Sequence, residues 1–259
     1  MLRNIVQQVS TFLLLAGLTT AAIWGAYQST MRDQQMASES QINDPTNVGR
    51  ALTNSETQAV VASRQSTVRV FSMDLADGGL SAMTGTYISY KGKYFVLTAA
   101  HGIYGGCILT SIGIDDELYD CMEITLLSRR WDYAVIQVEK LPHRVPIRIG
   151  HQSPTSKEWV AELATQNTVF YTGYPNDGGP YTFDGRIVGY NENNAVYVDS
   201  FGWSGSSGAG VFSQTGNLIG WVMALEVGDS YFGRQVLENF MWIIPLFKID
   251  WIGVESLAK

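Results

Sequence analysis

The chain has 259 residues, of which 46% are hydrophobic and 16% charged, and its 17 basic and 24 acidic side chains leave a formal net charge of −7. This apolar content excludes wholesale disorder and supplies the core of one large domain or two small ones. Because no stretch is rich in lysine and arginine, we expect no nucleic-acid partner.

The N-terminal segment 1–30 differs from the rest of the chain. Arg3 is followed by an uncharged stretch over 4–28, whose apolar part covers 11–27. That length lies between the apolar core of a signal peptide and the roughly 20 residues of a membrane-spanning helix. We therefore predict a hydrophobic helix that serves as a signal anchor or signal peptide. The protein is then membrane-anchored or exported, with its folded part outside the cytoplasm, in the periplasm or at the cell exterior. A buried N-terminal helix of the folded domain is the alternative.

Residues 31–65 are polar and contain few large apolar groups. This composition is typical of a spacer, so we expect a polar linker here, with a short helix over 54–64. The folded domain is then expected to cover 66–259.

From residue 66 onward, short strand-like segments alternate with turn signals. The segments are rich in Val, Ile, Tyr, Phe and Thr, and Gly, Asn, Asp or Pro separates them. They cover 67–75, 85–100, 106–114, 122–128, 133–140, 167–174, 184–192, 194–201, 209–228 and 239–246. Many short strands with almost no helical periodicity predict an all-β domain of closed or sandwiched antiparallel sheets. The exception is 245–258, where the apolar spacing predicts a C-terminal helix.

Three short segments carry residues that become reactive only when they meet. TAAH places His101 at a strand end after two small alanines, and WDYAVI places Asp132 directly before an apolar strand. GWSGSSGAGVF contains two overlapping Gly-x-Ser-Gly patterns, around Ser204 and Ser207. Each segment alone also fits an ordinary loop or a charged surface position.

Acyl transfer by a serine requires these three residue types in contact. An imidazole must accept the proton of the hydroxyl during attack, because the hydroxyl is otherwise a weak nucleophile. A buried carboxylate must hold the imidazole in the correct tautomer and stabilise its charged form. Backbone N–H groups must also face the developing oxyanion, and glycine beside the serine allows the tight turn that this needs.

The order and local context of the three motifs resemble those of the chymotrypsin-like (trypsin-like) serine peptidases. GYP and TGNLIGW are similar to segments of the family's HtrA-like and compact bacterial trypsin-like members, here without an appended PDZ domain. The likeness covers about 66–250. It implies two antiparallel six-stranded β-barrels with the site in the cleft between them. It also implies a serine endopeptidase that hydrolyses peptide bonds of a protein or peptide substrate.

The resemblance also distinguishes the two serines. After Ser207 the sequence reads GAGVF and then a turn and a second strand, as in the family. Counting from Ser204, the strand starts three residues late, which turns its buried side chains to the wrong face. We therefore expect His101, Asp132 and Ser207 to form the catalytic triad. The backbone N–H groups of Gly205 and Ser207 are then the oxyanion hole.

Two positions depart from the family pattern. Gly210 stands where the family most often has proline, so the loop after the serine is less rigid. Ser206 replaces the aspartate that pairs with a freed N-terminus in zymogen-activated members. We therefore do not expect activation by cleavage to a new N-terminus.

The resemblance further implies where the substrate side chain binds. The primary pocket is walled by the stretch before the nucleophile, 199–203, and by the strand 221–225. Phe201 lies where cleavage after Lys or Arg would need an acidic pocket floor, so we expect small or apolar substrate side chains, unless Asp199 points inward. The predicted lining residues are Phe201, Trp203, Val222 and Ala224.

The two cysteines, Cys107 and Cys121, lack C-x-x-C spacing, and the three histidines are scattered. We therefore expect no metal site and no cofactor. If 106–111 and 118–125 pair as a hairpin, the two sulfurs meet across it, and an extracytoplasmic location favours a disulfide. Two independent buried thiols are the alternative in a cytosolic domain.

A second class of function competes with the peptidase hypothesis. A catalytically weak or inactive trypsin-like domain can act as a peptide- or protein-binding module, since a fold alone never guarantees activity. The presence of all three triad residue types favours the enzyme. An α/β-hydrolase esterase is disfavoured, because that fold places Ser before Asp and His.

Overall fold

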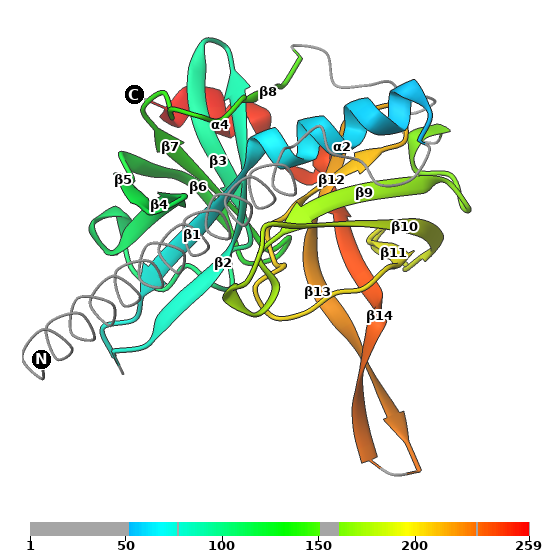
Figure 1. Ribbon diagram of the computed structural model, residues 1–259. Helices are drawn as coiled ribbons and strands as arrows, with labels where there is room; N and C mark the ends of the chain where they lie inside the picture. The colour runs from blue at the N-terminus through cyan, green and yellow to red at the C-terminus, as the bar shows by residue number, and fades with distance from the viewer. Residues whose placement is uncertain (1–51, 77, 151–160, 232, 259) are drawn as a thin grey trace, which may run out of the picture. The chain divides into compact units, whose positions relative to one another are not determined.

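Two β-sheets, one from each half of the chain, make up most of the described structure (Figure 1). The computed structural model describes residues 52–76, 78–150, 161–231 and 233–258. The hydrophobic helix predicted in 1–30 lies outside these residues and stays a prediction. No helix in the described ranges is long and apolar enough to cross a membrane.

The first half of the chain forms a curled antiparallel sheet with the strand order β5–β4–β1–β2–β3–β7–β6, and β8 pairs in parallel with β2. Lys91 and Gly92 both have positive φ (47° and 82°), which matches the two-residue turn that joins β2 to β3. The strands are β1 (Thr67–Met73), β2 (Leu80–Tyr90), β3 (Lys93–Thr98), β4 (Thr110–Ile114), β5 (Glu117–Asp120), β6 (Glu123–Ser128), β7 (Tyr133–Val138) and β8 (Ile147–Arg148).

The second half forms a closed antiparallel barrel with the strand order β10–β11–β14–β13–β12–β9. Closure joins β9 to β10 and leaves no free edge within the ring. The strands are β9 (Thr168–Gly173), β10 (Tyr181–Tyr190), β11 (Val196–Asp199), β12 (Gly210–Ser213), β13 (Leu218–Ser230) and β14 (Gly233–Pro245).

Each sheet encloses its own hydrophobic core. Val70 and Ile136 belong to the core of the first sheet, and Ile187 and Ile243 to that of the barrel; all four are fully buried. Burying an aliphatic side chain of this size stabilises the fold by roughly 1.5–3 kcal/mol. The predicted all-β, chymotrypsin-like architecture is confirmed. Of the two six-stranded barrels expected, the second is a closed six-stranded barrel, whereas the first is a curled sheet of eight strands.

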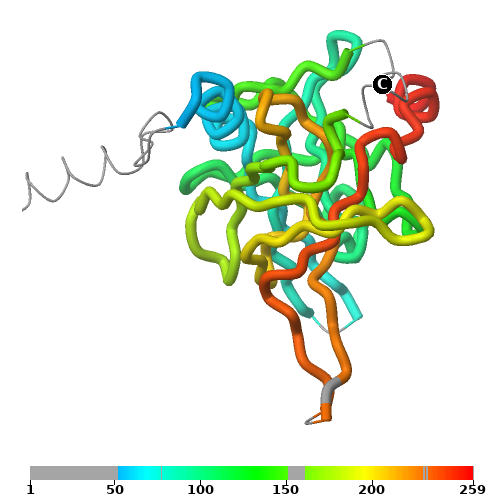
Figure 2. Tube along the Cα trace, turned by 90° about the vertical axis from the view of Figure 1, so that its right-hand side faces the viewer, coloured from blue at the N-terminus to red at the C-terminus, as the bar shows by residue number. Residues whose placement is uncertain are grey.

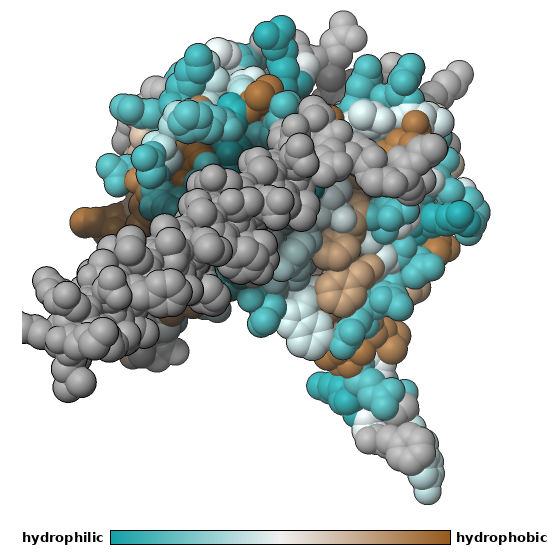
Figure 3. Space-filling model, in the orientation of Figure 1, coloured by the Kyte–Doolittle hydropathy of each residue, from teal (hydrophilic) through white to brown (hydrophobic). Residues whose placement is uncertain are grey.

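Strands β13 and β14 continue beyond the barrel as a two-stranded ribbon, which projects from it in both views (Figures 1 and 2). The ribbon is paired from Glu226 opposite Leu237 to its turn at Gly233. Figure 3 shows apolar side chains gathered on the barrel surface at the base of this ribbon. Strand β13 of the barrel therefore leads directly into an exposed arm.

Two helices flank the sheets. Helix α2 (Asn54–Ser66) begins with a capping box, in which Thr53 Oγ1 accepts from Glu56 N at 3.3 Å and Thr53 N donates to Glu56 Oε2 at 2.9 Å. It packs against β9 and β12 and coincides with the short helix predicted in the linker. After a turn at η3 (Leu246–Lys248), helix α4 (Trp251–Leu257) lies within the predicted C-terminal helical segment.

Candidate active site

Strand pairing brings His101 and Asp132 together. His101 follows the end of β3 and Asp132 precedes the start of β7, and these neighbouring antiparallel strands pair Thr98 with Ala134. His101 Nδ1 lies 2.7 Å from Asp132 Oδ2, and the backbone N of His101 donates to Asp132 Oδ1 at 2.7 Å. Both carboxylate oxygens of Asp132 therefore bond to His101. This arrangement favours the tautomer with a proton on Nδ1 and leaves Nε2 free to act as a base.

The environments of the two side chains differ. The Asp132 side chain is 13% exposed and that of His101 is 53% exposed. The Asp132 carbonyl accepts a hydrogen bond from Nε1 of the buried Trp221 at 3.0 Å, which ties it to the barrel. Arg129 donates to the carbonyl groups of Ala100 and, at 2.6 Å, Ile103, on both sides of the histidine. The carboxylate is thus fixed, while the imidazole remains open to a substrate.

Ser207 lies in the loop between β11 and β12 and approaches the strand that carries the histidine. A Cβ added at the neighbouring Gly208 would lie 2.8 Å from the backbone N of Ala99, two residues before His101. The Ser207 hydroxyl donates to the carbonyl of Met223 at 3.4 Å. No hydrogen bond joins Ser207 to His101 in the part of the chain that the structure describes. The structure thus pairs two of the predicted triad residues directly, and the hydroxyl of the third points to another partner.

In the loop over 200–209, called the nucleophile loop because it carries the predicted nucleophile Ser207, hydrogen-bonded and undonated backbone N–H groups alternate around that serine. The N–H of Ser206 donates to Trp203 O at 3.0 Å and the N–H of Gly208 to Val222 O at 2.7 Å. Within the described chain, the N–H groups of Gly205 and Ser207 have no such acceptor. These are the two groups that the sequence predicts as the oxyanion hole, and both are available for an incoming oxygen.

Carbonyl contacts fix the peptide units that carry these donors. Ser204 O accepts from Asn176 N at 2.6 Å, and Ser206 O accepts from Ala209 N at 3.0 Å. In a trans peptide the C=O and N–H groups point in opposite directions. Bonds to Ser204 O and Ser206 O therefore also orient the N–H groups of Gly205 and Ser207.

Two glycines allow the tight course of this loop. Gly205 and Gly208 have positive φ angles of 97° and 86°. A Cβ at Gly205 would overlap the carbonyl oxygen of Tyr174, and one at Gly208 would overlap that of Thr84. Glycine is therefore required at both positions by conformation and by space.

Ser206, which directly precedes the predicted nucleophile Ser207, is a buried serine. Ser206 is 1% exposed, and its hydroxyl has no hydrogen-bond partner within the described residues. It lies beside the hydroxyl of Tyr171, whose pKa is raised by burial. This position therefore carries no charge that a freed N-terminus would neutralise.

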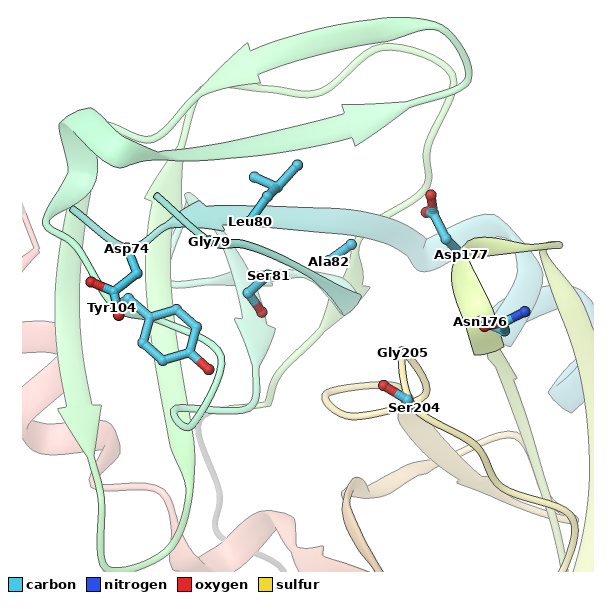
Figure 4. Close-up of a pocket in the computed structure, with 10 residues that line it drawn as sticks. All are labelled: Asp74, Gly79, Leu80, Ser81, Ala82, Tyr104, Asn176, Asp177, Ser204 and Gly205. Atoms are coloured by element: carbon cyan, nitrogen blue, oxygen red, sulfur yellow. The ribbon is translucent and has the colours of Figure 1, made fainter. Parts of the chain in front are cut away.

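A cavity of about 490 Å³ lies next to the nucleophile loop (Figure 4). Asp74 and Tyr104 line one side, and Asn176, Ser204 and Gly205 line the other. Because Gly205 is one of its lining residues, the cavity adjoins the predicted oxyanion hole. Its position and volume suit an extended peptide.

The predicted pocket residues occupy different environments. Phe201 and Trp203 are each 40% exposed and line a second cavity of about 490 Å³. Val222 is 2% exposed and belongs to the barrel core. Ala224 is half-buried on β13, opposite Trp242. The structure thus brings Phe201 and Trp203 together and leaves Val222 inside the barrel.

Leu225, which lies in the predicted pocket wall 221–225, and Met241, which the sequence did not indicate, fill the space beside Gly202. A Cβ added at Gly202 would lie 2.5 Å from Leu225 Cδ2 and 2.7 Å from Met241 Sδ. Asp199 is exposed. The position beside Gly202 is therefore filled by apolar side chains.

Cys107 and Cys121 form a disulfide with a Cα–Cα distance of 5.2 Å. It joins the short 3-10 helix η1 (Cys107–Leu109) to the residue that follows β5, across the β4–β5 hairpin. Over the described residues, no group of three His, Cys, Asp or Glu side chains is placed to hold a metal ion.

Comparisons with known proteins agree with this geometry. The family model of the trypsin-like peptidase domain matches residues 83–220. The active form of the Rv3671c protease from M. tuberculosis is 17% identical, with a TM-score of 0.56 over 77% of this chain and 84% of that chain. The serine endoprotease from Yersinia pestis is 19% identical, with a TM-score of 0.58 over 80% and 69% of the two chains. The HtrA-type protease AlgW with tripeptide is 16% identical, with a TM-score of 0.58 over 79% of this chain and 64% of that chain. No curated protein sequence matches the chain.

Proposed function

Because this chain belongs to the trypsin-like peptidase family, we propose that it is a serine endopeptidase that uses His101, Asp132 and Ser207. The observation that carries the proposal is the juxtaposition of the 2.7 Å His101–Asp132 pair with a loop whose two undonated N–H groups flank a serine hydroxyl. An acid–base pair and an oxyanion site are the two elements that acyl transfer by serine requires.

The proposed reaction begins with a rotation of the Ser207 side chain. Its hydroxyl leaves the Met223 carbonyl and turns to His101 Nε2 through a change of side-chain rotamer. Such nucleophile–base bonds are often unformed before substrate binds. As Ser207 Oγ bonds to the substrate carbonyl carbon, its proton passes to Nε2, and Asp132 stabilises the imidazolium.

The oxyanion then lies between the N–H groups of Gly205 and Ser207. When the C–N bond breaks, its electron pair goes to the leaving amine, which takes the proton from His101. This leaves an acyl ester on Ser207. Water attacks the ester with His101 as the base, and the proton returns to Ser207 Oγ as the acid product leaves.

The substrate is a protein or peptide in this proposal. The cavity lined by Gly205 and Tyr104 receives part of this substrate beside the proposed oxyanion hole. Leu225 and Met241 narrow the space beside Gly202, which supports a small apolar side chain before the cleaved bond. One structural neighbour was solved with a tripeptide, which fits this substrate class.

We place the peptidase domain outside the cytoplasm, in the periplasm or at the cell exterior. The Cys107–Cys121 disulfide supports this location, because structural disulfides persist mainly in oxidising compartments. In this proposal, the apolar segment 11–27 attaches the protein to the membrane.

A binding module is the second candidate, and the Ser207–Met223 hydrogen bond is the observation that favours it. A domain that keeps its hydroxyl on this carbonyl would bind peptides without cleaving them. The two candidates therefore differ in the reactivity of one serine.

Labelling with a fluorophosphonate probe tests the proposal, since the probe phosphonylates an activated serine and releases fluoride. We expect labelling of the wild type, loss in Ser207→Ala and retention in Ser204→Ala, which removes the exposed hydroxyl of the other Gly-x-Ser-Gly copy. Digestion of a peptide library by the same three proteins should follow the labelling. An unlabelled wild type that binds library peptides intact would establish the binding module.

A further inference from the structure

Thr84 connects the first sheet to the nucleophile loop through its side chain. It lies on β2 and is fully buried. Its hydroxyl donates to the carbonyl of Gly205 at 2.7 Å and accepts from the backbone N of Tyr174 at 3.0 Å. A single hydroxyl therefore bonds one half of the chain to two separate segments of the other.

The main chain of Thr84 adds two more hydrogen bonds at the same place. Its N–H donates to the carbonyl of Ser207 at 3.1 Å, and its carbonyl accepts from Thr98 Oγ1 at 2.7 Å. Gly205 and Ser207 are also residues whose own N–H groups donate no hydrogen bond within the described chain. Thr84 thus contacts both residues of the proposed oxyanion hole.

Gly205 depends on outside contacts for its orientation. Glycine has few conformational restraints of its own, so its N–H direction is set by bonds to the peptide units on either side. Asn176 N holds the preceding carbonyl of Ser204, and the Thr84 hydroxyl holds the following carbonyl of Gly205 itself.

We propose that Thr84 is a positioning residue, whose hydroxyl holds the Gly205 carbonyl and so fixes the backbone conformation of Gly205, the residue whose N–H faces the developing oxyanion. The inference rests on the serine peptidase function proposed above. Oxyanion donors accelerate the reaction because they are fixed before charge develops, and not because they bind the substrate more tightly. Loss of the hydroxyl should therefore lower kcat and leave KM nearly unchanged.

The same strand supplies a matched control. Thr86 lies two residues along β2, is 1% exposed, and has a buried hydroxyl without a hydrogen-bond partner. Thr84→Val and Thr86→Val make the same chemical change at similar burial. Only the first removes a hydrogen bond to the nucleophile loop.

Steady-state hydrolysis of a peptide that the wild type cleaves is the experiment. We expect Thr84→Val to lower kcat by about ten- to a hundredfold, somewhat less than the loss of a whole oxyanion donor, with KM within about twofold. Thr84→Ser restores the hydroxyl and should recover most of kcat, and Thr86→Val should match the wild type. A peptide boronic acid, which binds as a tetrahedral adduct, should lose affinity for Thr84→Val in parallel with kcat.

Thr84→Ala accompanies these variants, because it removes the hydroxyl without placing a methyl group against the Gly205 carbonyl. Circular dichroism and thermal unfolding identify which variants are folded at the assay temperature. A folded Thr84→Val or Thr84→Ala that equals Thr86→Val in kcat overturns the inference and leaves the proposed function intact. A rise in KM at unchanged kcat also overturns it. A wild type without hydrolysis or fluorophosphonate labelling overturns both.

Discussion

The two halves of the molecule position their reactive groups by different means. The first sheet holds its acid–base pair within itself, because adjacent strand ends bring His101 to Asp132 and Arg129 fixes the backbone on both sides of the histidine. The barrel presents a glycine-rich loop whose reactive groups are mainly backbone N–H groups. Several bonds that fix this loop come from outside it, including those from Thr84 in the other half.

This difference shows where each half is vulnerable. Side-chain chemistry in the first sheet is lost when one functional atom is replaced. Backbone chemistry in the barrel is lost when the loop changes course, even if every reactive atom remains. The predictions below separate these two kinds of failure.

Asp132→Asn should give the largest loss, since it alters the acid–base pair without changing its shape. The amide cannot act as an acceptor for both the His101 backbone N–H and Nδ1–H, so the imidazole is left in the wrong tautomer for accepting the serine proton. We expect kcat to fall by about 10⁴-fold with KM little affected. Steady-state kinetics measures this, and a loss below about tenfold would show that Asp132 does not orient the base.

Gly208→Ala should give the next largest loss, and it acts on the loop alone. The new Cβ would overlap the carbonyl oxygen of Thr84, so the Ser207 peptide must shift. We expect kcat to fall by about 10²–10³-fold, as for a lost oxyanion donor. Gly216→Ala is the control, because Gly216 has nearly the same φ of 87° and its added Cβ has no neighbour closer than 3.7 Å.

Equal losses of kcat in Gly208→Ala and Gly216→Ala would attribute the effect to backbone strain and not to displacement of the loop. Thermal unfolding of both variants further distinguishes backbone strain from displacement of the loop. Strain at a positive φ lowers stability in each variant, whereas the overlap with Thr84 occurs only at Gly208.

Much of the fold follows from the sequence because burial in a strand has a local signature. Alternating apolar residues predict the strands. Where one predicted segment contains two strands, turn residues mark the division between them. The predicted strand 85–100 is in fact the end of β2 and the whole of β3, separated at Lys91 and Gly92. The hairpin 209–228 likewise divides into β12 and β13.

The sequence predicts those site residues that stand in short recognisable segments, and not the contacts between residues far apart in the chain. His101 and Asp132 each stand at a strand end in a recognisable segment, and neighbouring strands then bring them together. The contacts of Thr84 and Trp221 are different, since they join residues 121 and 89 positions apart. Threonine and valine fit the alternating pattern of a strand equally well. The pattern therefore indicates that the threonine is buried, but not which group its hydroxyl bonds.

Removal of the disulfide should have the smallest effect on catalysis and would show how independent the two halves are. Cys107 and Cys121 are 14 residues apart at the edge of the first sheet, and the bridge restrains the unfolded chain. We expect the double variant Cys107→Ser/Cys121→Ser to lose about 2–4 kcal/mol of unfolding free energy with kcat unchanged. Denaturant unfolding beside steady-state kinetics measures both quantities. A parallel fall in kcat in the folded variant would mean that this edge of the first sheet also supports His101, and the acid–base pair would then be less self-contained than its contacts indicate.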